Sequence, residues 1–146
     1  MRWLIAATVM MMALVAKAAP SPEGVWFTID DETGEVRSRV ELTVVGGELR
    51  GHILEILKSD RPREEWFCDQ CRGSKRNAPL EGLQIIEGLT WDDRKQEWNG
   101  GTILDPANGR EYKALLSVAD DDQTLEVRGF VGFALIGRTQ NWQRAE

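Results

Sequence analysis

The chain has few of the residues from which most catalytic and metal sites are built. It contains two cysteines and a single histidine, His52. A Ser/His/Asp site needs an imidazole beside a nucleophile, and a structural zinc site needs about four cysteine or histidine ligands. No acid and base pair is placed by spacing either. We therefore expect no enzyme activity, no metal centre and no cofactor.

Long apolar runs are also scarce, and the only one lies at the N-terminus. The run from Leu4 to Val15 follows Arg2 and ends at Ala16-Lys17-Ala18, where small residues occupy the positions that a signal peptidase reads. It is too short to cross a bilayer core, which needs about 20 residues. The sequence predicts a signal peptide over residues 1–18, cleaved before Ala19. The mature chain is then periplasmic or secreted, with no membrane span.

Residues 19–146 are enough for one domain with one core. The full chain has a formal net charge of −6, and loss of Arg2 and Lys17 with the signal peptide makes it −8. Nucleic acids and anionic lipid surfaces bind cationic patches, so the acidic balance argues against either as a general partner.

No part of the mature sequence has the apolar spacing of an amphipathic helix; its apolar residues alternate instead. Val40, Leu42 and Val44 fall on one face of a strand, and Arg39, Glu41 and Thr43 on the other. Tight-turn residues separate such segments. The pattern predicts an all-β fold, an antiparallel up-and-down barrel of about eight strands, with a two-sheet β-sandwich as the alternative. The expected strands are 23–30, 35–45, 48–57, 83–91, 97–104, 110–119, 123–131 and 133–143.

Several motifs resemble known families. Gly24-Val-Trp26 looks like the Gly-x-Trp start of lipocalins, whose tryptophan closes one end of the barrel under an arginine from the last strand. Arg138 and Arg144 are placed to supply that cation, and Trp142 lies between them. We expect Gly24, Trp26, Arg138 and Trp142 to form the closure.

A longer resemblance covers nearly the whole mature chain. It rests on motifs that include Cys68-Asp-Gln-Cys71-Arg-Gly73, Trp98-Asn-Gly-Gly-Thr-Ile-Leu-Asp-Pro106 and Gly137-Arg-Thr-Gln-Asn-Trp142. In order and spacing they look like the uncharacterised secreted bacterial family known as domain of unknown function 2147. The resemblance implies a lipocalin-like fold and leaves the activity open.

Cys68 and Cys71 lie in the one long connection, residues 58–82, and have three interpretations. An exported protein favours a structural disulfide between them. A redox-active pair would need activation by a helix that the pattern does not predict. A metal site would need further soft ligands, and the chain offers only His52 and carboxylates such as Asp69.

Four residues are candidates for contacting a ligand. His52 could supply a polar contact at the barrel mouth, and Trp66 and Phe67 could form an aromatic lid on the long connection. Arg128 could bind a carboxylate if a bulge turned it inward, whereas strict alternation turns it outward.

These observations favour a binding module that holds one small apolar or amphipathic ligand in the periplasm. The alternatives are an interaction module that docks on an envelope protein and a Cys-x-x-Cys redox or metal-binding protein.

Overall fold

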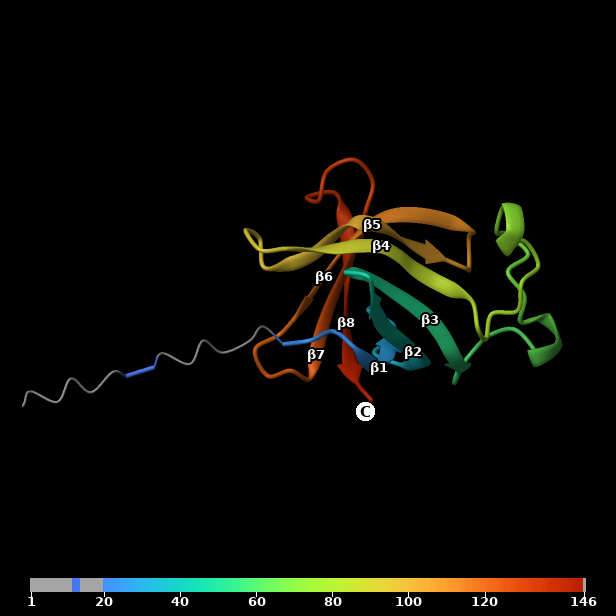
Figure 1. The fold of residues 1–146 in the computed structure, drawn as a ribbon. Coiled ribbons are helices and arrows are strands. Elements are labelled where there is room, and N and C mark those ends of the chain that lie inside the picture. Colours follow the sequence, from blue (N-terminus) through green and yellow to red (C-terminus); the bar gives the residue numbers. More distant parts are fainter. Residues whose placement is uncertain (1–11, 14–19, 146) are drawn as a thin grey trace, which may run out of the picture.

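The computed structural model describes residues 12–13 and 20–145, and its main feature is a closed barrel of antiparallel strands (Figure 1). The signal peptide predicted for residues 1–18, and its cleavage point before Ala19, lie outside the described residues apart from positions 12 and 13. The strands are β1 (Gly24–Ile29), β2 (Val36–Val45), β3 (Glu48–Ile56), β4 (Gln84–Asp92), β5 (Glu97–Asp105), β6 (Arg110–Val118), β7 (Thr124–Phe130) and β8 (Gly137–Arg144).

Each strand pairs with its neighbours in sequence, and β8 returns to pair with β1. The closing register places Trp26 opposite Arg144 and Phe27 opposite Gln143. Closure leaves no free sheet edge. The up-and-down barrel predicted from the alternation is confirmed, and the two-sheet sandwich is wrong.

Alternation along the strands sets which side chains fill the interior. On β2, Val40 and Leu42 are buried while Glu41 between them is exposed. The same pattern on the other strands gathers large apolar side chains inside the barrel. The most buried of them are Trp26, Leu42, Leu49, Ile86, Leu89, Leu116, Leu125 and Trp142.

Glycine allows the strands to approach one another where the barrel curves. At Gly101 on β5, a Cβ atom would overlap the backbone of β4 at Glu87 and Gly88. Register is lost nearby, between Trp98 and Gly101 in the β5–β6 pairing. Only a residue without a side chain fits here, as expected where a strand bends.

The eighth strand begins later than predicted. It was expected over 133–143 but starts at Gly137, and residues 131–136 form a loop. Gly132 adopts a φ of 75°, and the Ile136 amide donates to the Phe133 carbonyl at 3.0 Å, which makes a turn instead of a strand. This loop extends beyond the strand ends (Figure 1).

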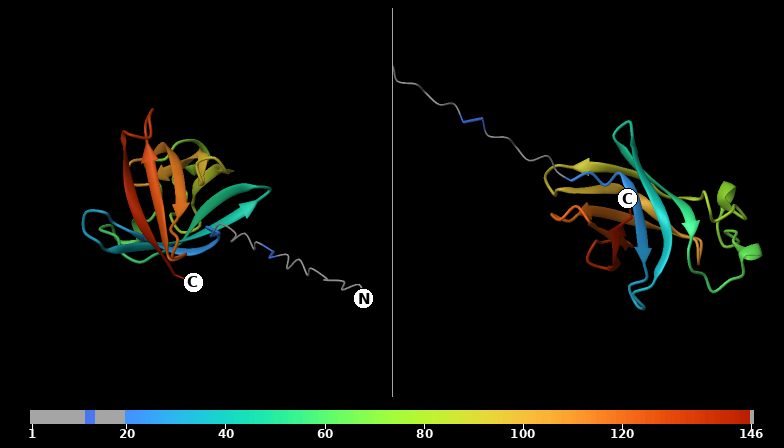
Figure 2. Two further views of the ribbon diagram at one scale, coloured as in Figure 1. Left: turned by 90° about the vertical axis from the view of Figure 1, so that its left-hand side faces the viewer. Right: turned by 90° about the horizontal axis from the view of Figure 1, so that it is seen from below.

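Residues 57–83 connect β3 to β4 outside the barrel, as the right-hand view of Figure 2 shows. They contain two single 3-10 turns, Arg63–Glu65 and Gly73–Lys75, and a bridge between Phe67 and Pro79. Within residues 12–13 and 20–145, no helix has the length and apolar character needed to span a membrane.

Candidate functional site

The barrel contains a cavity of about 810 Å³ that reaches one end of the strands. The loops at that end join β1 to β2, β3 to β4, β5 to β6 and β7 to β8, and we call this end the mouth. Residues of all four loops line the cavity, among them Asp30, Ser59, Pro106 and Val131. A volume of this size is typical of sites for small organic ligands.

The opposite end is closed by Trp26 and Arg144. Trp26 is fully buried, its indole N–H donates to the Pro22 carbonyl at 2.8 Å, and the Arg144 guanidinium lies 4.2 Å from its ring centroid. Arg144 also donates to the carbonyls of Ser21, Glu23 and Asp122 and pairs with the Asp122 carboxylate at 2.8 Å. These bonds tie the segment before β1 to β8 and the β6–β7 turn.

Arg138, which the motif suggested as the closing cation, lies at the mouth. Its guanidinium pairs with the carboxylate of Asp31 and lies 3.5 Å from that of Glu32. Arg138 is the second residue of β8 and Arg144 is its last, so only Arg144 comes opposite Trp26. The assignment of Arg138 to the closure is therefore wrong, and Arg144 has that role beside the buried Trp142.

Apolar side chains dominate the inner wall of the cavity. They come from five strands, so the wall is continuous around the barrel; the main ones are Ile53, Ile85, Ile103, Val127 and Trp142. All are buried or half-buried. Such a wall favours the apolar part of a ligand, because its burial removes apolar surface from water.

A few polar groups face the interior, and each already has a partner. The hydroxyls of Thr28 and Ser38 lie 2.7 Å apart, and the Gln140 side-chain oxygen accepts the Trp142 indole N–H at 3.0 Å. Ser38 is buried. A ligand can therefore occupy this depth without leaving these groups unpaired.

Three cationic side chains line the cavity at its mouth, each beside an acid. Arg138 pairs with Asp31, Lys58 pairs with Glu35, and Arg37 lies 3.8 Å from Glu35. The Arg138 hydrogen bonds hold the pKa of Asp31 below its usual range. They also raise the pKa of Arg138.

Another carboxylate of this rim, that of Asp30, is held by the backbone. One of its oxygens accepts the amides of Glu32 and Thr33 at 2.9 and 3.1 Å. These hydrogen bonds lower the pKa of Asp30. The lowered pKa values of Asp30 and Asp31 and the raised pKa of Arg138 all favour the charged forms of these groups, and Arg138 can exchange its acidic partner for a ligand anion.

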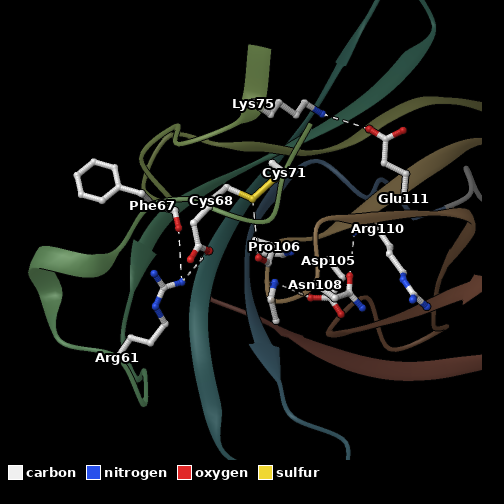
Figure 3. Close-up of a disulfide and its surroundings, with 12 residues drawn as sticks. Arg61, Phe67, Cys68, Cys71, Lys75, Asp105, Pro106, Asn108, Arg110 and Glu111 are labelled. Carbon is white, nitrogen blue, oxygen red and sulfur yellow. Dashed lines mark hydrogen bonds and ion pairs between the residues drawn. A yellow bond between two sulfur atoms is a disulfide. The ribbon is translucent and has the colours of Figure 1, made fainter. Parts of the chain in front are cut away.

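Cys68 and Cys71 form a disulfide, as the sequence favoured, and both are buried. Figure 3 shows the disulfide of the long connection beside the β5–β6 turn. Cys68 Sγ lies 3.8 Å from the Pro106 carbonyl oxygen. The fit is tight, because a Cβ at Gly109 would overlap the backbone of Gln70. The disulfide therefore packs the 57–83 connection against the rim, where its Leu80 lines the cavity.

The other interpretations of the cysteines find no support in this geometry. A buried disulfide offers no accessible thiolate for exchange. Among residues 12–13 and 20–145, no group of three His, Cys, Asp or Glu side chains could hold a metal ion.

The four residues proposed to contact a ligand do not line the cavity. His52 lies between Gly51 and Ile53, which are buried, so alternation turns it to the outer face. Arg128 likewise lies between the inward positions 127 and 129, and it donates to the Ala134 carbonyl and the Thr139 hydroxyl at 2.6 and 2.7 Å. No bulge interrupts the register of β7, so the inward option for Arg128 is wrong.

The expected aromatic lid is absent from the mouth. Trp66 donates its indole N–H to the Arg61 carbonyl at 3.0 Å and lies beside Arg63, within its own loop. Phe67 is exposed and points away from the disulfide in Figure 3. These side chains stabilise the connection locally and leave the mouth uncovered.

The polar residues of the cavity were not predicted from the sequence. Two of them carried a signal: Ser38 occupies an inward position beside Val40, and Gln140 occupies one beside Trp142. A polar residue at an inward position of a barrel strand indicates either a buried pair or a ligand contact. Arg37 and Lys58 lie near strand ends, where alternation gives no such signal.

Comparisons with known proteins identify a family to which the sequence matches and a solved structure with a similar fold. A family model described as "Uncharacterized protein conserved in bacteria (DUF2147)" matches residues 24–144. Among solved structures, protein HP1028 of Helicobacter pylori, described as belonging to the lipocalin family, superposes with a TM-score of 0.70. The match covers 85% of this chain and 82% of that one at 17% identity, so it establishes a shared fold.

A curated relative matches over a shorter stretch. The chain is 33% identical over 89 residues to the tRNA pseudouridine synthase Pus10 of Halorubrum lacusprofundi. That stretch is 60% of this chain but spans only 19% of the synthase.

Proposed function

The chain belongs to the DUF2147 family of uncharacterized bacterial proteins, and from this membership and its lipocalin-like barrel we propose that it binds one small amphipathic ligand. The cavity of about 810 Å³ inside the barrel is the observation that carries the proposal. Ligand sites of this kind combine a mostly apolar wall with a few placed polar groups.

The distribution of the lining residues gives the ligand an orientation. Its apolar part lies against Ile85, Ile103 and Val127, and its polar end lies at the mouth. There, Arg37, Lys58 and Arg138 favour an acidic headgroup such as a carboxylate or a phosphate. The hydroxyls of Thr28 and Ser38 already bond to each other, which lowers the cost of placing an apolar tail at their depth.

We place this binding in the periplasm or outside the cell. The support is the signal peptide predicted for residues 1–18, together with the disulfide, because disulfides persist in oxidising compartments.

A binding role fits the chemistry of the site better than catalysis does. The sole histidine lies on the outer face, and no thiol is free in the described part of the chain. The similarity to part of a tRNA-modifying enzyme does not favour RNA as a partner, since a net charge of −6 opposes binding to a polyanion.

The test is a titration with a fluorescent fatty acid, combined with native mass spectrometry of protein purified from its own bacterium. Gly129 faces the cavity, and a Cβ there would make only ordinary contacts with Ile103 and Tyr112. Gly129→Leu should fill part of the cavity and weaken binding by roughly tenfold or more. Glu126→Leu, on the outer face of the same strand, is the matched control and should bind as the wild type does.

The expected mass spectrum contains a co-purifying species of lipid size that is absent from the Gly129→Leu protein. Binding that is equal in the wild type and in the Gly129→Leu protein, or its complete absence from the wild type, would show that the cavity is not the site.

A further inference from the structure

The loop between β7 and β8 exposes four apolar side chains. Val131, Phe133, Leu135 and Ile136 are 67%, 77%, 93% and 68% exposed. Such a cluster is unusual on a protein surface, where large apolar groups mostly occur singly. The loop extends away from the barrel at its mouth end (Figure 1).

The apolar side chains are held outward by hydrogen bonds within the loop. Arg128 Nε donates to the Ala134 carbonyl at 2.6 Å, and the Ile136 amide donates to the Phe133 carbonyl at 3.0 Å. The Val131 amide also donates to the Ile136 carbonyl at 3.4 Å. These bonds keep the loop extended from the barrel instead of folded into the cavity.

The loop is continuous with the cavity. Phe130, Val131 and Ile136 line the cavity at the mouth, while Phe133 and Leu135 lie at the tip of the same loop. Apolar side chains are therefore present from the exposed loop tip to the rim of the cavity, whose inner wall includes Val127. An acyl chain that entered the cavity beside this loop would meet apolar side chains at each of these points.

The size and shape of the loop argue against a second copy of the chain as its binding partner. A stable protein interface buries about 800 Å² on each partner. Four side chains on a six-residue loop supply on the order of 500 Å² of apolar surface, the size of one exposed patch. A projecting tip also offers no flat face for a rigid partner, whereas a bilayer deforms around it.

Cationic side chains lie beside the loop on one flank. A groove of about 620 Å³ next to the mouth has Val131 in its wall together with Arg72 and Arg110. Within the described residues, neither arginine forms an ion pair, in contrast to the paired cations of the rim. Free guanidinium groups next to an apolar tip complement the phosphates of a lipid surface.

We propose that the 131–136 loop inserts into the interface of a phospholipid bilayer and sets the barrel mouth against it. The acidic net charge of the chain argues against binding to a membrane through a broad cationic face, but insertion needs only the 131–136 loop at one end of the barrel. The ligand would then be a lipid that leaves or enters the membrane at the loop. This identification of the ligand rests on the proposed binding function, whereas membrane docking itself does not.

The test places an environment-sensitive dye on the loop. Leu135→Cys, labelled without reductant so that the disulfide stays intact, is mixed with vesicles of equal parts phosphatidylglycerol and phosphatidylethanolamine. Lys95→Cys, on the β4–β5 turn at the closed end, is the matched control. We expect a blue shift and higher intensity at position 135, and no change at position 95.

A second variant tests which side chains insert. Phe133→Ser combined with Leu135→Ser, at two positions of the loop tip that do not line the cavity, should weaken vesicle binding by roughly tenfold or more, since it removes much of the apolar surface that would insert. Circular dichroism and binding of a soluble fluorescent fatty acid show whether this variant keeps its fold and cavity.

The outcomes separate docking from ligand binding. Fatty-acid binding with no dye response at position 135 would overturn membrane docking and leave the proposed function standing. A dye response at position 135 without fatty-acid binding would overturn the proposed function and leave membrane docking standing. Equal responses at positions 95 and 135, or a dimer in sedimentation that the serine substitutions abolish, would also overturn docking.

Discussion

Arg144 stacks on Trp26 at the closed end of the barrel, with its guanidinium carbon 4.2 Å from the ring centroid. The two residues are register partners across the only strand pair that joins the two ends of the sheet, β1 with β8. That pair is also the shortest in the barrel, with two partnered positions. The stack and its hydrogen bonds therefore reinforce the seam where the barrel closes.

Arg144→Ala should destabilise the protein strongly. It removes a cation–π contact worth about 0.5–2 kcal/mol and charge-assisted hydrogen bonds to three carbonyls. We expect a loss of about 2–4 kcal/mol in the free energy of unfolding, measured by urea denaturation. Arg138→Ala, at the mouth on the same strand, should cost about 1 kcal/mol or less, because its ion pair is largely exposed. Equal losses would contradict a special role for the seam.

The pairing of Asp31 with Arg138 should make stability depend on pH in one direction. The pKa of Asp31 is lower in the folded state, so its contribution is present at neutral pH and is lost as the pH falls through the folded pKa. Asp31→Asn should therefore be slightly less stable than the wild type at pH 7. The difference should vanish in strongly acidic buffer, which denaturation curves at both pH values can check. A difference that grows on acidification would contradict this sign.

Removal of the disulfide should loosen the 57–83 connection more than the barrel. Closure of so short a loop constrains the unfolded chain by only about 2 kcal/mol. In a Cys68→Ser/Cys71→Ser protein we expect faster hydrogen exchange at the amides of Cys68 and Asn77, which bond to Ala78 and Cys68. Strand amides should exchange at wild-type rates. Global acceleration in every strand would show that the disulfide supports the whole barrel.

Two glycines that face different surroundings should respond differently to alanine. At Gly101 the new Cβ overlaps the backbone of β4, which cannot move without breaking the sheet, so we expect a loss of about 2 kcal/mol or more. At Gly129 the new Cβ makes ordinary contacts, so the change should be near neutral. Thermal unfolding of the two variants measures this difference in stability.

The strands were predictable because their side chains alternate between a dry interior and water. Positions such as Val40 and Leu42 give this pattern directly, and closure follows from eight strands without a free edge. The same parity places Arg128 on the outer face, as strict alternation requires. His52 could have been placed there too, since its neighbours Gly51 and Ile53 are inward.

The residues that form the mouth were less predictable, because loops lack the alternating pattern of side chains that identifies a strand. Arg37, Lys58 and Arg138 meet only through the closure of the sheet, and no local pattern indicates that they share a rim. The expected strand 133–143 included residues 133–136, which form part of a loop instead. Apolar character does not distinguish a core from a surface that binds an apolar phase, and here the side chains are exposed.

Residues 20 and 145 both lie at the closed end, where the Ala145 amide donates to the Val25 carbonyl. An attachment made at residue 20 or at residue 145 would leave the mouth of the cavity and the 131–136 loop at the opposite end of the barrel. The protein could thus be immobilised or fused at these ends with the mouth of the cavity still accessible. A linker joining the two ends would span a short gap, and new ends could then be cut in the exposed β4–β5 turn.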